Sequence, residues 1–447
     1  MRRVDRWKIR SGAIAAGALA LGAFAATAPA MAAQAKAGPV STNPARGTPA
    51  LVKTSGKETG NVRQLVQCGG MMYAVGKFTA ITQGGRTFSR SNVFSFKATA
   101  PYTVSGLNVG VNGVVNSVAF NGSNCTDAYI GGSFTSVHGT TARNIAEINT
   151  STGAVVKTFG RNANGEVDTL LGHRGHLLVG GHFTSVNGSG RDYYASLSPS
   201  SGKDDGFLNL NIHGGVRGSP TLIYNQQLSH SGNLLLVEGN FASAGGRPRQ
   251  QIFMANLSGS TAKVTGWTSP EFSQHCVTKL AFYVRAAAWS PGDSTVYTAT
   301  TGLHLLTWNH TFPLTGLCDS VAAFPATQRS VTHTWIEYSG CDSYYSVAAD
   351  NGAVYAAGHP RWAHNQDACN GKGPGAITDR GMQGLNPGNG AVELNSQGTA
   401  KYHMSRANAD DMLITSAGLW IASSNRFGSD NCNNVSGLTG ICFLPYS

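Results

Sequence analysis

The sequence predicts an all-β fold in which a unit of four short strands repeats around a ring, and three observations support this prediction. One stretch occurs four times, as "AVGKFTAITQGG" at 74–85, "IGGSFTSVHG" at 130–139, "VGGHFTSVNG" at 179–188 and "VEGNFASAGG" at 237–246. Short apolar runs separated by Gly, Asn and Ser turns surround each copy, as expected for β-strands. No segment beyond residue 32 shows a sustained helical period. Repeats of this kind are typical of the blades of a β-propeller.

Residues 1–32 are predicted to be a secretory signal peptide. Residues 1–10 are basic, residues 11–28 are almost entirely small and apolar, and small-residue cleavage sites end at Ala30 or Ala32. A membrane anchor is the alternative, but the cleavage pattern favours a signal peptide. Residues 33–47 are small and polar and are expected to form a flexible mature N-terminus. No later run approaches the ~18 apolar residues of a membrane-spanning helix, so the protein is expected to be secreted and extracellular.

The regular repeats occupy residues 60–270. Their central phenylalanines are spaced by 56, 49 and 58 residues, and they are Phe78, Phe134, Phe183 and Phe241. Apolar runs such as "VVNSVAF" precede each central stretch, and runs such as "RNIAEIN" and "GAVVKTF" follow it. One blade cannot bury both of its faces alone, so the units must stack around an axis. The phenylalanines are expected to fill the gaps between neighbouring blades.

An arginine recurs after the central stretch of the repeat. It is clearest as Arg143, Arg191 and Arg249, and Arg90 is a weaker match. These side chains are expected to donate hydrogen bonds to loop carbonyls of their own blade. A ligand site formed by a ring of arginines is the alternative, although a role repeated once per blade is more often structural.

Residues 271–447 contain divergent copies of the same unit. Tyr297, Tyr355 and Trp420 occupy the place of the strand before the phenylalanine, which predicts seven four-stranded blades, with six as the alternative. Residues 48–55 contain "ALVKT", which resembles the fourth-strand sequence "AVVKT" at 154–158. This segment is expected to complete the last blade beside 440–446, so that strands from both chain ends share that blade and close the ring. Residues 48–447 would then be a single β-propeller.

The repeat units resemble those of exported actinobacterial proteins of the delta-sixty type and, more distantly, the propeller ectodomain of the fungal cortical polarity marker. The resemblance rests on the "GGxFTSVxG" stretches followed by Arg143, Arg191 and Arg249, and it covers roughly residues 60–270. It implies a secreted or surface-displayed propeller. It carries over no catalytic residues.

All eight cysteines lie after the leader, and an even number in an exported chain predicts disulfides. Cys68 and Cys125 occupy nearly equivalent places in adjacent units and are expected to pair. Ten residues spanning a Gly/Asn turn favour a Cys432–Cys442 pair. Sequence order favours the remaining pairs, which are Cys276–Cys318 and Cys341–Cys369. The absence of a CxxC motif leaves a zinc ribbon without support.

The charge pattern and the motifs restrict the function. After residue 32, 28 basic and 21 acidic residues give a net charge of +7, without the basic block that nucleic-acid binding requires. No GxSxG, HExxH or Walker motif is present. Asp204–Asp205 and Asp410–Asp411 are adjacent pairs expected in solvated turns. Acids from separate segments that meet in space, as in glycosidases, stay an open alternative.

No metal or other cofactor is expected. His173 and His176 form a spaced pair in a turn, but two visible ligands are too few to predict a metal site. The stretch "GSDNCNNVSG" at 428–437 superficially resembles a calcium loop, but Asp430 is its only acid. Calcium at this stretch is kept as the alternative.

Tryptophan is concentrated in the divergent region, where it is either repacked core or part of a binding face. Six of the seven lie at or after residue 267, and they are Trp267, Trp289, Trp308, Trp335, Trp362 and Trp420. Two loops there combine aromatic rings with hydrogen-bond donors, as sugar and peptide ligands require. The candidate site consists of Arg361, Trp362, His364, Asn425, Arg426 and Phe427.

These observations predict a disulfide-stabilised extracellular β-propeller that acts as a binding module for polysaccharide or a protein partner. It is expected to be a monomer and not an enzyme. One alternative is a polysaccharide hydrolase or lyase, which would require a close pair of acids in the central funnel. A structural envelope protein without a small ligand is the other.

Overall fold

The computed structural model describes residues 38–52, 60–216, 219–273, 276, 282–302, 316–404, 409–424, 432, 433, 435 and 437–447. These residues form an all-β fold, as predicted, and the longest helix among them is the 3₁₀ helix η2 (Pro270–Ser273). In this part of the chain, no helix has both the length and the apolar character needed to cross a lipid bilayer.

Seven main sheets of three or four antiparallel strands make up the fold. The first four contain β2 (Asn61–Cys68), β3 (Met71–Lys77) and β6 (Val93–Lys97); β7 (Val114–Asn121), β8 (Asn124–Ser133) and β11 (Ile145–Asn149); β12 (Val167–His173), β13 (His176–Gly181) and β16 (Tyr194–Leu197); and β17 (Leu222–Leu228), β18 (Leu234–Asn240), β21 (Ile252–Asn256) and β22 (Lys263–Val264). The other three contain β23 (Tyr283–Trp289), β24 (Thr295–Thr301), β25 (Ser320–Pro325) and β26 (Trp335–Tyr338); β27 (Tyr344–Ala349), β28 (Val354–Gly358) and β31 (Met382–Leu385); and β32 (Ala409–Thr415), β33 (Gly418–Ser423) and β34 (Ile441–Pro445).

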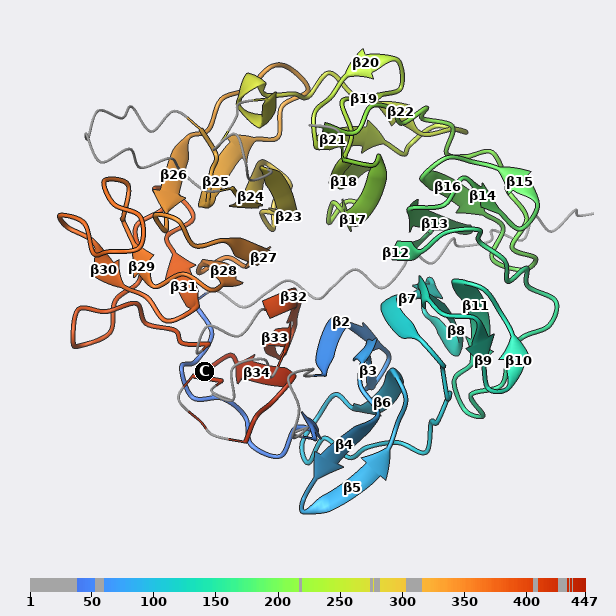
Figure 1. Ribbon diagram of the computed structural model, residues 1–447. Coiled ribbons are helices and arrows are strands. Elements are labelled where there is room, and N and C mark those ends of the chain that lie inside the picture. Colours follow the sequence, from blue (N-terminus) through green and yellow to red (C-terminus); the bar gives the residue numbers. More distant parts are fainter. Residues whose placement is uncertain are drawn as a thin grey trace, which may run out of the picture.

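Smaller sheets lie at the periphery (Figure 1). They are formed by β1 (Ala50–Leu51), β4 (Ala80–Gln83) and β5 (Arg86–Ser89); β9 (Ser136–Val137) and β10 (Thr140–Thr141); β14 (Ser185–Val186) and β15 (Ser189–Gly190); β19 (Ser243–Ala244) and β20 (Arg247–Pro248); and β29 (Trp362–Ala363) and β30 (Ile377–Thr378).

The main sheets are arranged around a common centre, with the first strand of each sheet nearest that centre (Figure 1). The first strands of successive sheets contact one another, and β32 of the last sheet contacts β2 of the first. In several three-stranded sheets an isolated bridge stands where a fourth strand would pair, for example Ile148 with Val155. This arrangement is a β-propeller fold, as the repeats predicted.

Hydrophobic clusters fill the spaces between neighbouring sheets. Phe183 is fully buried and packs with Ala119 and Tyr129 of the preceding sheet, and Phe134 and Phe241 occupy corresponding clusters. Another cluster joins the last sheet to the first, and in it Trp420 stacks on Phe443 with ring centroids 4.1 Å apart. The prediction that the repeated phenylalanines fill gaps between blades is therefore confirmed.

Most of the tryptophans in the divergent region are core residues. Trp267, Trp289, Trp335 and Trp420 are all buried in clusters between sheets. Trp308 lies outside the described residues. Tryptophan therefore marks the repacking of divergent sheets at these four positions, which was one of the two interpretations of the sequence.

The N-terminal contact with the last sheet differs from the prediction. Of the segment 48–55, residues 48–52 are described, and their strand β1 pairs with β4. Its one backbone hydrogen bond toward the last sheet runs from the amide of Leu51 to the carbonyl of Thr439, at 3.0 Å, just before β34. The backbone amides of Ser41 and Ala45 donate to the carbonyls of Pro445 and Phe443, at 2.8 and 2.9 Å, so residues 41–45 lie antiparallel to β34. Val40 is buried in the hydrophobic cluster that includes Leu444 of β34.

The four predicted disulfides are all present. The Cα–Cα distances are 5.7 Å for Cys68–Cys125, 5.8 Å for Cys276–Cys318, 4.7 Å for Cys341–Cys369 and 5.4 Å for Cys432–Cys442. The first bond links the first two sheets, as the equivalence of its cysteines in adjacent units predicted.

The structural role expected for the recurring arginines is also confirmed for two of them, since Arg90 and Arg249 donate to the carbonyls of Ser105 and Thr265.

Candidate functional site

A central cavity of about 630 Å³ lies among the innermost strands of the propeller. Each of these strands has a β-bulge at the same position, and each bulge inserts one extra residue into the pairing with the second strand. All seven bulge residues line the cavity, and they are Arg63, Asn116, Asp168, Tyr224, Arg285, Tyr345 and Asp410. The bulges therefore place one residue from each sheet on the cavity wall.

Two tyrosines and an arginine form one part of this wall. The guanidinium carbon of Arg285 lies 5.3 Å from the ring centroid of Tyr345 and 6.0 Å from that of Tyr224. Tyr224 donates its hydroxyl to the carbonyl of Val284, and the Tyr345 hydroxyl lies 2.8 Å from Nε2 of His359. Both rings are therefore held by hydrogen bonds on either side of the cation, an arrangement that favours cation–π attraction.

Asp410 and Asp411 form an acidic part of the wall. Asp410 accepts a hydrogen bond from Nδ2 of Asn61 at 3.0 Å, and Asp411 accepts one from the backbone amide of Leu65 at 3.1 Å. Burial raises the pKa of each carboxyl to about 6. The expectation that this pair lies in a solvated turn was wrong, because both residues belong to the innermost strand β32.

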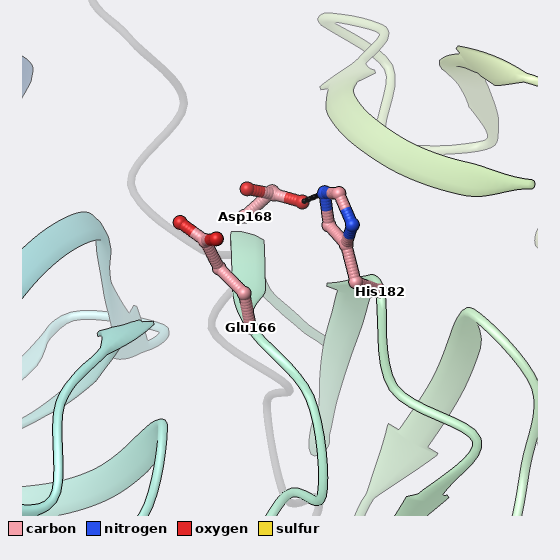
Figure 2. A group of neighbouring side chains, drawn as sticks. All are labelled: Glu166, Asp168 and His182. Atoms are coloured by element: carbon pink, nitrogen blue, oxygen red, sulfur yellow. Dashed lines mark ion pairs between the residues drawn. The ribbon is translucent and has the colours of Figure 1, made fainter. Parts of the chain in front are cut away.

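Three potential metal ligands meet at the third sheet. Glu166 directly precedes β12, Asp168 is the bulge residue of β12, and His182 directly follows β13 (Figure 2). Nε2 of His182 lies 3.1 Å from Oδ2 of Asp168, and one potential ligand atom of each residue lies within 4.8 Å of the others. Nδ2 of Asn116 donates to Oε1 of Glu166 and to Oδ1 of Asp168, at 2.8 and 3.2 Å.

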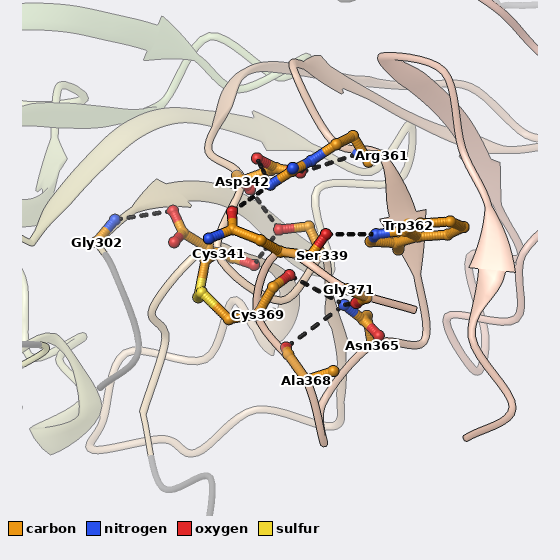
Figure 3. Close-up of a disulfide and its surroundings, with 12 residues drawn as sticks. Gly302, Ser339, Cys341, Asp342, Arg361, Trp362, Asn365, Ala368, Cys369 and Gly371 are labelled. Atoms are coloured by element: carbon orange, nitrogen blue, oxygen red, sulfur yellow. Dashed lines mark hydrogen bonds and ion pairs between the residues drawn. A yellow bond between two sulfur atoms is a disulfide. The ribbon is translucent and has the colours of Figure 1, made fainter. Parts of the chain in front are cut away.

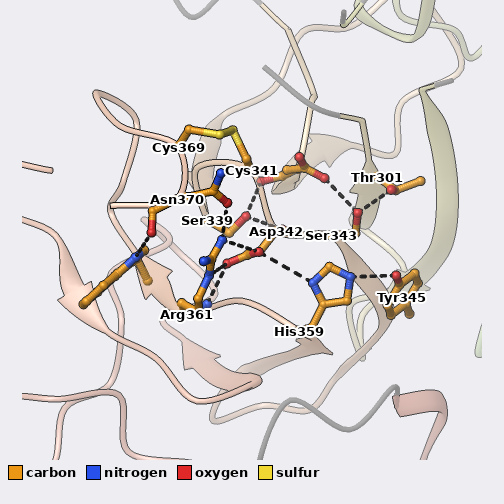
Figure 4. A network of polar contacts seen from close by, with 12 residues as sticks. Thr301, Ser339, Cys341, Asp342, Ser343, Tyr345, His359, Arg361, Cys369 and Asn370 are labelled. Atoms are coloured by element: carbon orange, nitrogen blue, oxygen red, sulfur yellow. Dashed lines mark hydrogen bonds and ion pairs between the residues drawn. A yellow bond between two sulfur atoms is a disulfide. The ribbon is translucent and has the colours of Figure 1, made fainter. Parts of the chain in front are cut away.

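A second histidine connects the cavity to a buried carboxylate. His359 contacts the Tyr345 hydroxyl through Nε2, and its Nδ1 lies 3.7 Å from Oδ1 of Asp342 (Figure 4). His182 and His359 occupy the same place in their sheets, because each directly follows the second strand, β13 or β28. In both sheets this histidine contacts the bulge residue of the first strand.

The described half of the loop site predicted from sequence lies at the periphery, in and beside the small sheet of β29 and β30. Arg361 donates to both carboxylate oxygens of Asp342, from Nε at 2.7 Å and from Nη2 at 2.9 Å (Figure 3). Nε1 of Trp362 donates to the carbonyl of Asn370 at 3.3 Å, and His364 forms an ion pair with Glu337. Arg361 and His364 are therefore engaged with carboxylates of the protein itself.

The other half of that site, Asn425, Arg426 and Phe427, lies outside the described residues, as does Asp430 of the calcium-like stretch. His173 is buried, and desolvation lowers its pKa to about 4. His176 instead pairs with Asp205, with 2.7 Å between Nδ1 and Oδ2. The two histidines do not belong to any group of metal-ligating side chains found among the described residues.

The bulge residues of the cavity wall were not predicted, because they lie on the first strand of each unit, whereas the repeated motif begins in the second strand. The first strands contain an aligned pattern of their own, in "NVRQL", "VVNSV", "EVDTL" and "YVRAA". In each, a buried apolar residue precedes the bulge residue, as Val62 precedes Arg63 and Val284 precedes Arg285. Comparison of the residue after this apolar position across the seven units would have identified the cavity wall.

Comparison with models of protein families finds no match, and a search of curated proteins finds none either. Among solved structures, the chain is similar to that of U3-55K, with a TM-score of 0.50 and 10% sequence identity over 90% of this chain and 100% of that one. It also matches the WD40 β-propeller domain of Doa1, with a TM-score of 0.45 and 14% identity over 85% of this chain and 95% of that one. At such identities, a likeness concerns the fold alone.

Proposed function

We propose that the chain is an exported, seven-bladed β-propeller that binds a sugar residue of an anionic extracellular polysaccharide in its central cavity. Under this proposal the seven main sheets are the blades of one ring, and the contact between the last and first sheets closes it. The protein acts as a monomer after removal of residues 1–32. Under the same proposal it belongs to the delta-sixty type of secreted propeller, which its repeats resemble.

The observation that carries the proposal is the position of Arg285. Its side chain lies on the cavity wall between two tyrosine rings and donates no hydrogen bond to any described residue. A guanidinium presents a planar set of donors that matches a carboxylate or a sulfate. Arg285 is therefore available for an anionic group of a ligand.

The rest of the cavity suits a sugar ring. Tyrosine rings offer flat faces on which a sugar can stack, and Tyr224 and Tyr345 are both held in place by hydrogen bonds. Asp168 and Asp410 offer acceptors for sugar hydroxyls on the same wall. The volume of about 630 Å³ is within the range of ~300–1,000 Å³ that small-ligand sites occupy.

A polysaccharide lyase or hydrolase is the second candidate, and the contacts of Tyr345 favour it. A tyrosine hydroxyl hydrogen-bonded to a histidine, which is in turn near a carboxylate, can take up or release a proton. Arg285 beside that hydroxyl would neutralise the carboxylate of an acidic sugar. The carboxyls of Asp410 and Asp411, with pKa values of about 6, supply further candidate acids in the cavity.

The test is a glycan array that contains neutral, carboxylated and sulfated polysaccharides, followed by titration calorimetry with the best oligosaccharide. We expect binding to anionic glycans, and Arg285→Gln and Tyr345→Ala should each weaken it at least about tenfold, which is ~1.4 kcal/mol. Trp362→Ala is the matched control, because Trp362 is an aromatic residue at the periphery of the same propeller.

The outcomes separate the candidates. Loss of binding in Trp362→Ala but not in Arg285→Gln would place the ligand on the peripheral loops instead of the cavity. Unsaturated or newly reducing products from a bound glycan would identify an enzyme. A folded protein that binds no glycan would contradict the proposal and favour a protein partner or a structural role.

A further inference from the structure

We propose that Glu166, Asp168 and His182 bind a divalent transition-metal ion at the wall of the central cavity, with Zn²⁺ preferred over Mn²⁺ and Ca²⁺. The metal site does not require the proposed glycan, although Asp168 lines the cavity and belongs to both proposals. No metal ligand was predicted among these residues from the sequence.

The first argument is the convergence of the three side chains. One potential ligand atom from each lies within 4.8 Å of the others, whereas ligand atoms around one metal ion, with bonds of about 2.0–2.2 Å, are at most about 4.4 Å apart. A small side-chain adjustment is therefore enough to bring all three onto one ion. Figure 2 shows the two carboxylates and the imidazole gathered at the ends of β12 and β13.

The second argument is the backbone that fixes these positions. The backbone amide of His182 donates to the carbonyl of Glu166 at 2.8 Å, so the two residues are held opposite each other. Asp168 is displaced from the regular ladder by the bulge between Val167 and Thr169. Strand alternation would otherwise separate neighbouring side chains, and the bulge re-aims one of them.

The third argument is electrostatic. An ion pair with His182 needs only the carboxylate of Asp168, yet the carboxylate of Glu166 lies beside it. Two negative charges at this separation repel each other. A divalent cation between the two carboxylates would remove this repulsion.

Neighbouring side chains orient the carboxylates as outer partners do in metal sites. Asn116 donates its amide to both Glu166 and Asp168. The guanidinium of Arg63 donates to the amide oxygen of Asn116, which fixes the Asn116 nitrogen toward the carboxylates. Asn116 contacts Oδ1 of Asp168, whereas the other carboxylate oxygen, Oδ2, lies 3.1 Å from Nε2 of His182.

The donor types determine the preferred ion. Ca²⁺ and Mg²⁺ favour sites composed entirely of oxygen ligands, whereas an imidazole nitrogen favours Zn²⁺ and related ions. Mn²⁺ accepts mixed donors but binds more weakly than Zn²⁺ in the general affinity order of these metals. Three protein ligands leave at least one position on the ion for water or for a group in the cavity.

The test is titration calorimetry of Zn²⁺, Mn²⁺ and Ca²⁺ into the EDTA-treated full mature chain, prepared without a polyhistidine tag. We expect one Zn²⁺ per chain, with Mn²⁺ and Ca²⁺ weaker. Glu166→Gln, Asp168→Asn and His182→Gln should each lower the affinity for Zn²⁺ at least about tenfold. His176→Gln is the matched control, because His176 belongs to the same sheet and also pairs with an aspartate, Asp205.

A second measurement tests the metal site in the wild-type protein and the control variant, so that it does not depend on ligand variants that fold poorly. Co²⁺ bound to the wild-type protein should give visible absorption bands that disappear on addition of Zn²⁺ and persist in His176→Gln. Failure of the wild-type protein to bind Zn²⁺ at millimolar concentration would overturn the proposal. So would His182→Gln with unchanged affinity for Zn²⁺, or Ca²⁺ binding more tightly than Zn²⁺.

Discussion

The guanidinium of Arg361 and the carboxylate of Asp342 form a two-point ion pair, with contacts of 2.7 and 2.9 Å. The side chain of Asp342 is 6% exposed and that of Arg361 is 30% exposed. Burial acts to raise the pKa of Asp342, but hydrogen bonds from His359 and Arg361 outweigh it and hold the pKa below its usual value. The carboxylate is therefore charged, and Arg361 is its main partner.

We expect Arg361→Ala to lower the free energy of unfolding at pH 7 by about 2–3 kcal/mol, because it leaves a buried carboxylate without its cation. Trp362→Ala should change it by less than about 1 kcal/mol, since the indole is only partly buried. Urea denaturation of both variants measures the difference. The deficit of Arg361→Ala should shrink as the pH falls below about 4, because Asp342 is then protonated in the unfolded chain, and it should vanish once the pH falls below the lowered pKa of Asp342 in the folded wild-type protein. An equal loss in both variants would contradict this assignment.

Glu238 should make the protein less stable as the pH rises. It is fully buried in β18, its carboxyl oxygens have no hydrogen-bond partner among the described residues, and burial raises its pKa to about 8. Between about pH 4.5 and 8 the unfolded chain has lost this proton and the folded chain has kept it, so the free energy of unfolding falls with pH and levels above 8.

Glu238→Gln should remove that dependence and raise stability at pH 9 by a few kcal/mol, at roughly 1.4 kcal/mol per unit of pKa difference. Denaturation with urea at pH 5, 7 and 9 tests this. The free energies of unfolding of the wild-type protein and of Glu238→Gln should be most similar at pH 5. A parallel pH dependence in wild type and variant would show that Glu238 is ionised in the folded state.

Phe183→Ala should destabilise the protein strongly without changing the cavity wall. Its fully buried ring fills the space between the second and third sheets, so its removal should cost about 3–5 kcal/mol. Thermal or urea denaturation measures the loss, and binding of Zn²⁺ by the folded fraction should be unchanged. A loss below about 1 kcal/mol would mean that the neighbouring sheets close the gap.

The contact of residues 41–45 with β34 should contribute to stability. A chain that begins at residue 48 should be less stable than one that begins at residue 38 by about 3 kcal/mol or more. It loses the burial of Val40 and the backbone hydrogen bonds of Ser41 and Ala45. It also exposes the edge of β34. Comparison of the melting temperatures and of aggregation on heating tests this, and equal melting temperatures would contradict it.

The sequence predicted the packing of the sheets better than the site. The phenylalanines and the pairing of Cys68 with Cys125 followed from equivalent positions in adjacent units, which the structure places side by side. The cavity wall did not follow, because a bulge changes the direction of a side chain without changing the apolar pattern around it. The role of Arg361 depends on Asp342, which lies on a different segment.

The N-terminal pairing was misassigned for a related reason. Residues 50–54 resemble a fourth-strand sequence, but the three residues Ala50 to Val52 lie beside β4 instead. The segment that does lie beside β34, residues 41–45, shows no alternation of apolar residues. It is held there by the backbone hydrogen bonds of Ser41 and Ala45. Such pairing is independent of side-chain type, so composition alone cannot locate it.

Along each innermost strand, the bulge separates the positions that are buried between sheets from the position that lines the cavity. The apolar residues on either side of a bulge, such as Val62 and Leu65, are buried between sheets, while the bulge residue contacts the cavity. Substitution at a bulge position can therefore alter the chemistry of the cavity while the packing between sheets is kept. Seven such positions, combined freely, give a very large number of cavity walls on one scaffold. The fold is consequently well suited to diversification by evolution, and to a designed library randomised at Arg63, Asn116, Asp168, Tyr224, Arg285, Tyr345 and Asp410.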